Sequence, residues 1–166
     1  DFIIGSSHLV NGKDPCLKSF FENRSEKESY IEYFESTLKN VKIFTEYNIY
    51  GHLDYVVRYG PNKNKFFDFN DYKDIFEQIL KIIIQTGKGI EINTEDLANG
   101  LGYPHPHKEI LEMYKNLGGK IITIGSDAHI SNRLGYKFNI AEEILKGIGF
   151  KYYSVFKNQN IKFYKL

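Results

Sequence analysis

The sequence has little cysteine and no tryptophan: Cys16 is the one cysteine among 166 residues. A single cysteine excludes a disulfide within the chain and a zinc finger built from a cysteine cluster. Such a chain suits a reducing compartment, so we expect a cytoplasmic protein. No stretch approaches the roughly 20 apolar residues of a membrane span, so we expect no membrane partner.

Neither sign of charge dominates the sequence. Lys and Arg together number 22, Asp and Glu number 21, and the formal net charge is +1. This balance argues against a general attraction to nucleic acid or anionic lipid, and we expect no nucleic-acid partner. Hydrophobic residues make up 42% and charged residues 26%, which is ordinary for a globular protein. No linker or low-complexity tract divides the chain, so we expect one domain over residues 1–166.

The chain opens in "DFIIGSSH", without an initiator Met and within an apolar run typical of a strand. We expect from this opening that the domain is truncated at its N-terminus. The first strand would then expose unpaired N–H and C=O groups along one edge, and such edges template association. The sequence thus predicts either a homo-oligomer or association with the missing N-terminal segment.

Short apolar runs alternate with longer helical patterns along the chain. The runs typical of strands are residues 2–6, 47–51, 88–93, 120–125, 151–156 and 160–166. Between them, apolar side chains recur at helical spacing, as Ile31, Phe34, Leu38 and Val41 do. Alternation of this kind is typical of an α/β fold with a mostly parallel sheet and helices packed outside it.

Side chains of the metal-binding types follow the first four strands. They are His8 in "GSSH", His52 in "GHLD", Glu91 and Asn93 in "EINTE", and Asp127 and His129 in "GSDAH". The carboxyl ends of parallel strands meet at one rim, where α/β proteins build their sites. Asp127 and His129 stand two positions apart, so on extended backbone both would face one ion. Imidazoles and carboxylates suit Zn²⁺, Fe or Mn²⁺, so we expect divalent metal ions as cofactors.

Each of these residues also has a purely structural interpretation. Asp54 in "GHLD" would cap a turn, and Glu91 would pair with a basic residue at the edge of the core. His105 and His107 in "YPHPHKEI" either belong to an ordinary loop or touch a substrate. The planar guanidinium group of Arg58 suits phosphate, and its alternative is a surface ion pair. Four strand ends in a row, and not any one residue, favour a site.

Several segments, taken together, point to a known family. "DFIIGSSH", "GHLDYVVRY", "GIEINT", "YPHPHKEIL", "LGGKIITIGSDAH" and "LGYKFNIAEEILKGIGF" resemble, in order, the PHP-family histidinol-phosphate phosphatases. The resemblance implies part of a distorted (β/α)₇ TIM-like barrel that lacks its N-terminal strands. It also implies a cluster of divalent metal ions. The implied reaction is hydrolysis of L-histidinol phosphate, a small-molecule phosphate ester, to L-histidinol and phosphate in histidine biosynthesis.

The positions at the rim, together with the resemblance for His8, His52, Arg58, Asp127 and His129, suggest roles for individual residues. The expected metal ligands are His8, His52, Asp127 and His129. The residues expected to bind the substrate are Arg58, Glu91, Asn93 and His105. Asp127 and His129 are also expected to be catalytic, as groups that handle a proton.

The chain departs from the family pattern in two places. The family begins with an "HxH" motif and a bridging Glu upstream of "GSxH", and neither lies in this chain. Where the family commonly reads "NTSGLR", this chain reads "NTEDLAN", so Ala98 stands at the Arg position and a phosphate contact is lost or supplied elsewhere. We expect a good phosphatase in the parent protein and a poor one in this chain alone, because metal sites weaken when ligands are missing. The alternatives are another PHP-family phosphoesterase and an inactive metal-binding fragment.

Overall fold

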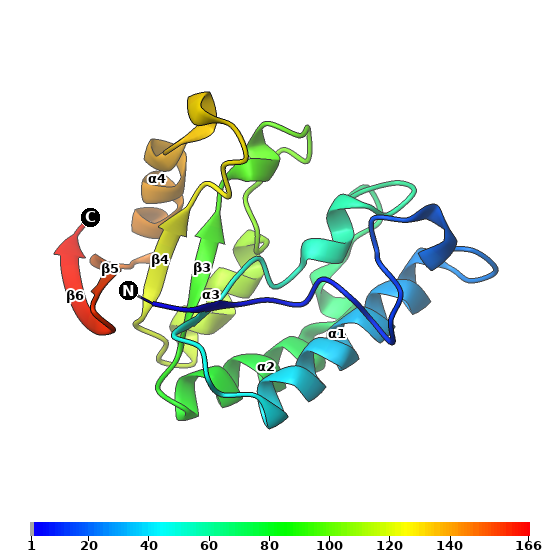
Figure 1. Ribbon diagram of the computed structural model, residues 1–166, viewed down its shortest axis with the longest axis horizontal. Coiled ribbons are helices and arrows are strands. Elements are labelled where there is room, and N and C mark those ends of the chain that lie inside the picture. The colour runs from blue at the N-terminus through cyan, green and yellow to red at the C-terminus, as the bar shows by residue number, and fades with distance from the viewer. Residues whose placement is uncertain (1) are drawn as a thin grey trace.

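A parallel sheet of four strands forms the centre of the structure. The computed structural model describes residues 2–166, and the sheet has the order β1 (Ile4–Gly5), β2 (Ile49–Tyr50), β3 (Gly89–Asn93) and β4 (Ile122–Gly125). Each strand pairs in parallel with the next one along the chain (Figure 1). All five residues of β3 are buried, as expected for a strand that is covered on both faces.

A helix lies in each crossover between neighbouring strands. The helices are α1 (Glu26–Ile43), α2 (Lys73–Gln85), α3 (Lys108–Asn116) and, after β4, α4 (Phe138–Ile148). Figure 1 shows α1 and α2 side by side, and α4 lies beside β4. Parallel strands need such crossovers, and the expected α/β class with a parallel sheet is confirmed.

The start of α1 follows from a capping box. The Ser25 hydroxyl accepts a hydrogen bond from the Glu28 N–H at 3.2 Å, and the Glu28 carboxylate accepts one from the Ser25 N–H at 2.8 Å. These two bonds satisfy N–H groups that a helix start leaves free. The helix therefore begins at Glu26, ahead of the apolar pattern that indicated it in the sequence.

Tyr and Phe side chains fill the core between α1 and α2. Phe34 of α1 lies with its ring centroid 4.6 Å from that of Phe76 and 5.1 Å from that of Tyr72. Tyr30 of α1 joins the same cluster, with its ring centroid 6.2 Å from that of Tyr72. Truncating a buried Phe to Ala typically costs about 3–5 kcal/mol of unfolding free energy, so this cluster ties the two helices together.

The last two strands form a hairpin that is separate from the parallel sheet. β5 (Tyr152–Lys157) and β6 (Asn160–Lys165) pair antiparallel. The expectation that residues 151–156 extend the parallel sheet is therefore wrong. Asn158 and Gln159 both have positive φ, at 50° and 61°, and a two-residue turn of that geometry reverses the chain. Ser154 still anchors the hairpin to β4, because its hydroxyl accepts from the Ile122 N–H at 3.2 Å.

Short 3-10 turns follow three strands at their carboxyl ends. They are η2 (Tyr55–Arg58) after β2, η4 (Glu95–Leu97) after β3 and η5 (Ser131–Arg133) after β4. Two further turns, η1 (Lys18–Phe20) and η3 (Phe69–Asp71), precede α1 and α2. Over residues 2–166, no helix combines the length and the apolar character that crossing a membrane requires.

Candidate active site

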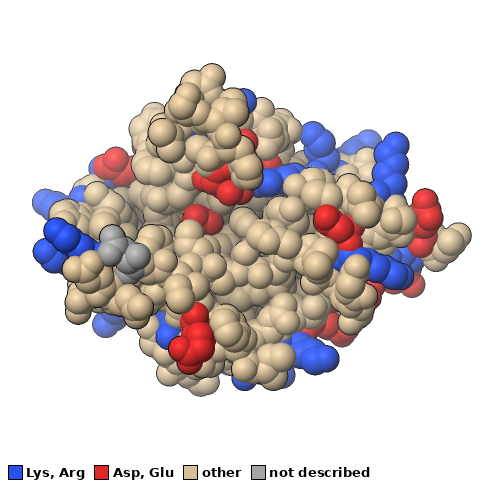
Figure 2. Space-filling view, in the orientation of Figure 1, with Lys and Arg blue, Asp and Glu red and all other residues tan. Residues whose placement is uncertain are grey.

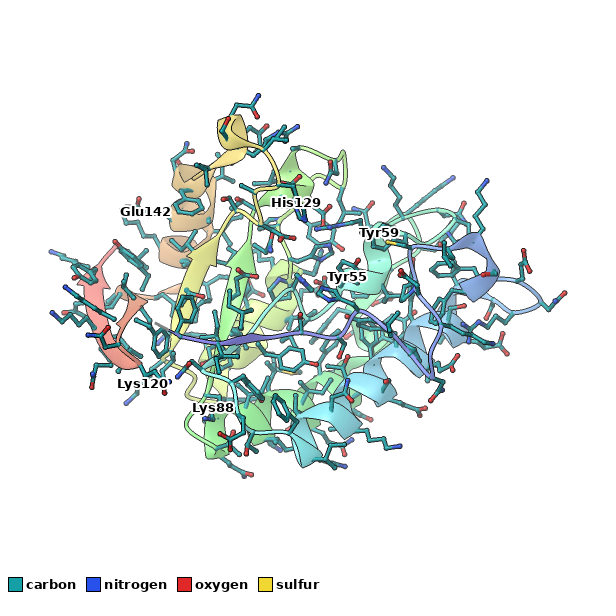
Figure 3. All side chains as sticks on the ribbon, viewed as in Figure 1. Tyr55, Tyr59, Lys88, Lys120, His129 and Glu142 are labelled. Carbon is teal, nitrogen blue, oxygen red and sulfur yellow. The ribbon has the colours of Figure 1, made fainter. Side chains whose placement is uncertain are left out.

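The candidate residues gather at the carboxyl end of the sheet. His129 lies beyond the end of β4 in Figure 3, while Lys88 and Lys120, which precede β3 and β4, lie at the opposite end. Tyr55, which begins η2, and Tyr59, which follows it, lie to one side of the same rim. Acidic side chains gather near the middle of this face, with a basic side chain beside them (Figure 2).

His8 and His52 are in direct contact across the first two strands. Their Nε2 atoms lie 3.2 Å apart, and the ring of Tyr55 packs against both rings at 5.1 and 4.8 Å between centroids. His8 is exposed and His52 is buried. Burial, with His105 and His8 nearby, lowers the pKa of His52 to about 3. The His52 ring is therefore neutral and keeps a lone pair.

The spacing of the two Nε2 atoms fits a shared cation. Two nitrogens bound to one tetrahedral Zn²⁺ at about 2.0–2.1 Å lie roughly 3.4 Å apart, close to the distance between His8 and His52. His52 also has a φ of 28°, a positive value that residues other than Gly seldom adopt. Such backbone strain clusters at functional sites and is consistent with a constrained ligand.

Glu91 occupies the space between β2 and β4 at the rim. Its carboxylate accepts a hydrogen bond from the Asn93 side-chain amide at 3.1 Å. A Cβ on Gly125 would overlap this carboxylate, and one on Gly51 would lie 3.2 Å from it. Burial raises the pKa of Glu91, and the charge of Asp127 adds to the rise. Glu91 therefore pairs with Asn93 and not with a basic residue, and it lies close to Asp127.

Asp127 and His129 do not have the extended geometry that the sequence suggested. Asp127 has a φ of 47°, so the two side chains are not presented by a strand, and β4 ends at Gly125. The contact between them is instead from side chain to backbone: His129 Nδ1 donates to the Asp127 carbonyl at 2.7 Å. This bond fixes the proton on Nδ1 and leaves a lone pair on Nε2 of the exposed His129.

The structure brings the four expected metal ligands together only in part. His8 and His52 touch, whereas Asp127 is near enough to Glu91 for its charge to raise the pKa of that carboxyl. Among residues 2–166, no three His, Cys, Asp or Glu side chains are grouped as a complete metal site. A full set of ligands at this rim stays a prediction.

A second cluster, which begins at η2, links four titratable side chains, three of which are fully buried. His105 is fully buried, with Nδ1 2.5 Å from Asp54 Oδ1 and with Nε2 in contact with Asp96 Oδ2. Asp96 in turn accepts from Arg58 Nε at 2.7–2.9 Å. Both carboxylates have no exposed surface. We call this set the buried charge chain: Asp54, His105, Asp96 and Arg58.

Two residues that were expected to contact the substrate, His105 and Asn93, are buried. His105 cannot touch a substrate here, because it has no exposed surface and both ring nitrogens face carboxylates. Asn93 is also buried: its amide donates to Glu91, and its Oδ1 accepts from the Glu95 N–H at 3.0 Å. Both residues therefore support the site and do not face solvent.

Sequence reasoning missed Asp96 and underestimated Asp54. Asp54 was expected to cap a turn, but its side chain makes no capping bond to η2 and instead accepts from the His107 N–H at 2.9 Å. The motif "GHLD" was a signal for Asp54, because an acid follows the candidate ligand His52. No sequence signal identified Asp96, whose partners lie 38 positions before it and nine positions after it.

Strands, helices and rim define an α/β protein with imidazole and carboxylate groups at the carboxyl ends of parallel strands. Residues 1–95 match the model of the PHP domain family, which is more than half of the chain, and the chain therefore belongs to that family. The similarity to its members extends beyond the matched residues, as individual relatives show.

The curated relatives carry related names. The chain is 33% identical over 162 residues to a histidinol-phosphatase of Lactococcus lactis, covering 97% of this chain and 60% of the relative. It is 37% identical over 158 residues to a probable histidinol-phosphatase of Thermotoga maritima, covering 92% and 64%. The chain thus spans about three fifths of the length of the curated relatives that it matches.

Solved structures give the same result for the fold. A crystal structure of histidinol phosphate phosphatase from Lactococcus lactis, complexed with Zn, L-histidinol and phosphate, matches with a TM-score of 0.86 and 32% identity. The match covers 98% of this chain and 62% of that one. A putative histidinol phosphatase from Listeria monocytogenes matches at 0.71 with 18% identity, covering 84% and 57%, and shows the fold alone.

Proposed function

We propose that the protein carrying this chain is a metal-dependent phosphomonoesterase that hydrolyses L-histidinol phosphate to L-histidinol and phosphate. One observation carries the proposal: the match, over 98% of the chain, to a phosphatase complexed with Zn, L-histidinol and phosphate. The contact between His8 and His52, with its cation-sized spacing, supports metal binding in this chain.

We propose His8, His52, Asp127 and His129 as the residues that hold divalent ions such as Zn, Fe or Mn. When bound, such an ion offsets negative charge on phosphate oxygens and lowers the pKa of a water molecule. His52 is suited to this role because it stays neutral. The Nε2 lone pair of His129 either binds an ion or accepts a proton, and the bond from Nδ1 to the Asp127 carbonyl orients the ring for both.

Arg58 is the proposed contact to the substrate phosphate. Its guanidinium carbon lies 5.3 Å from the centre of the Tyr55 ring, and that ring packs on both histidines. A planar guanidinium matches phosphate oxygens, and its charge is retained at every working pH. Glu91 is proposed to support the site, because its carboxylate packs against Gly51 and Gly125 at the ends of β2 and β4.

The proposal also covers the complete fold, the domain and the cellular compartment of the protein. The parallel sheet would be part of a distorted (β/α)₇ barrel, the chain would lie within a single domain, and the protein would act on a small phosphate ester in the cytoplasm. Two rivals are a different phosphoesterase specificity and a metal-binding protein without activity.

Turnover of L-histidinol phosphate by the full-length, metal-loaded protein tests the function. We expect release of inorganic phosphate from L-histidinol phosphate at a far higher kcat/KM than from a panel of nucleotides and sugar phosphates. Preference for a nucleotide would favour the first rival, and no turnover of any ester with metal bound would favour the second.

A further inference from the structure

The buried charge chain joins the two ends of η2 to η4 and to the loop before α3. Asp54 lies just after β2, His105 precedes α3, Asp96 belongs to η4, and Arg58 ends η2. The loop that carries His105 is fixed to β3 by two backbone bonds, from Asn93 N–H to the His105 carbonyl at 2.6 Å and from His105 N–H to the Asn93 carbonyl at 2.9 Å. His105 is therefore held from its backbone as well as from its ring.

Within the buried charge chain, two positive side chains balance two negative ones. Two fully buried carboxylates are unfavourable unless cations accompany them. Burial by itself lowers the pKa of His105, but Asp54 and Asp96 outweigh it and raise the pKa to about 9. Burial likewise opposes a charged Asp96, yet His105 and Arg58 lower its pKa. Protonated His105 and Arg58 thus offset Asp54 and Asp96.

Asp96 holds Arg58 through Nε, and the Arg58 side chain keeps 14% of its surface exposed. Its Nε faces Asp96, and its guanidinium group rests against the rings of Tyr55 and Tyr59, 5.3 and 5.8 Å from their centres. Arg58 Nη2, in contrast, is buried and finds no hydrogen-bond partner within residues 2–166. A buried donor without a partner is costly, so its persistence indicates that other contacts impose the orientation.

We propose that Asp96, held in place by His105 and Asp54, is a positioning residue that fixes Arg58 through Nε, so that the partly exposed guanidinium group is oriented for an oxyanion of the substrate. The contacts of Asp96 are to Nε and not to the terminal nitrogens, which are the atoms that a guanidinium fork offers to phosphate oxygens. The inference rests on the proposed function and deepens it, because it assigns the orientation of the phosphate contact to a residue that never touches the substrate.

The opposite role for the same contact is that Asp96 merely neutralises Arg58 and withholds it from anions. The two roles predict opposite effects of the Asp96 charge on phosphate affinity. If Asp96 positions Arg58, removing its charge weakens phosphate binding, whereas if Asp96 competes with phosphate, removing its charge strengthens it.

Product inhibition of the full-length, metal-loaded enzyme separates these roles. For Asp96→Asn, we expect the inhibition constant of inorganic phosphate and the KM of L-histidinol phosphate both to rise about tenfold. The inhibition constant of L-histidinol, which carries no phosphate, should stay unchanged, and kcat should fall less than KM rises. Asp71→Asn, at a surface ion pair with Lys27, is the matched control and should leave all these constants unchanged.

A double-mutant cycle makes the coupling explicit. Arg58→Lys should weaken phosphate inhibition to a similar extent, and adding Asp96→Asn to it should have little further effect, because both changes remove one oriented contact. If Asp96→Asn does not fold, His105→Gln tests the same support and should shift phosphate inhibition in the same direction by a smaller factor.

Three outcomes would overturn the inference. They are unchanged phosphate inhibition in Asp96→Asn, tighter phosphate inhibition in that variant, and equal weakening of phosphate and L-histidinol inhibition, which a general distortion of the site would cause. Absence of L-histidinol phosphate turnover in the unmutated enzyme would instead refute the proposed function. In that case, calorimetric titration of the unmutated protein and Asp96→Asn with inorganic phosphate still tests the positioning of Arg58.

Discussion

The Nε2 atoms of His8 and His52 lie 3.2 Å apart, although 44 positions separate these residues in the chain. The parallel register of β1 and β2, in which Gly5 pairs with Tyr50, places both histidines just past neighbouring strand ends. Their contact makes the junction of β1 and β2 the place on the rim where two of the expected metal ligands meet. The proposed metal centre is therefore expected to depend most directly on this pair.

Replacing His52 by Ala should remove metal from the protein. The change deletes a neutral, buried nitrogen that faces His8. We expect a lower metal content and a loss of phosphatase activity on the order of 100-fold or more. Elemental analysis of protein purified without chelator, together with turnover assays, checks both. His107→Gln is the control, because the His107 ring packs on Phe67 and Tyr103, and a variant of it that lost metal equally would contradict the assignment.

Two substitutions at His129 separate the roles of its ring nitrogens. Asn places its amide near the position of Nδ1 and can keep the bond to the Asp127 carbonyl, while it leaves no atom at the position of Nε2. If Nε2 binds a metal or carries a proton, His129→Asn should lose as much kcat as His129→Ala. Near-normal kcat in His129→Asn would mean that the ring only braces the loop after β4.

Stability should fall as pH rises from 6.5 to 9. The folded protein raises the pKa of His105 to about 9 from its ordinary 6.5, so its stabilising proton is retained fully below pH 6.5 and lost on the way to pH 9. The loss in unfolding free energy is on the order of 3 kcal/mol from this group. Denaturant unfolding across this range measures it. His105→Gln should be less stable at pH 6.5 and much flatter with pH, and an equally steep profile would exclude His105 as the cause.

A methyl group at Gly125 should disturb the rim, while one at Gly147 should not. The Cβ of Gly125→Ala would overlap the Glu91 carboxylate, which must then move away from Asn93. We expect a loss of about 1–3 kcal/mol in unfolding free energy and weaker metal binding. Gly147 lies in α4 with nothing within 4 Å of an added Cβ, so Gly147→Ala should stabilise by about 0.5–1 kcal/mol. Thermal unfolding of both variants makes the comparison, and similar shifts would refute it.

The sequence by itself determined the class of fold and the order of its elements. Apolar periodicity reports which faces are buried, and it located β3, β4 and all four helices because those faces pack on one core. The family followed from the same segments, since the strand-end motifs keep their order along the chain. The polar residues at strand ends were also visible, because buried apolar runs end abruptly in them.

Tertiary structure alone decided how those polar residues are used. The burial of His105 depends on its loop pairing with Asn93, and no local pattern in "YPHPHKEI" encodes a contact with β3. The ion pair between Asp96 and Arg58 joins residues that are 38 positions apart. The hairpin of β5 and β6 follows from positive φ at Asn158 and Gln159, neither of which is Gly. Local propensity specifies where elements begin and end, whereas the pairing of charges is settled by burial, which exists only once the chain has folded.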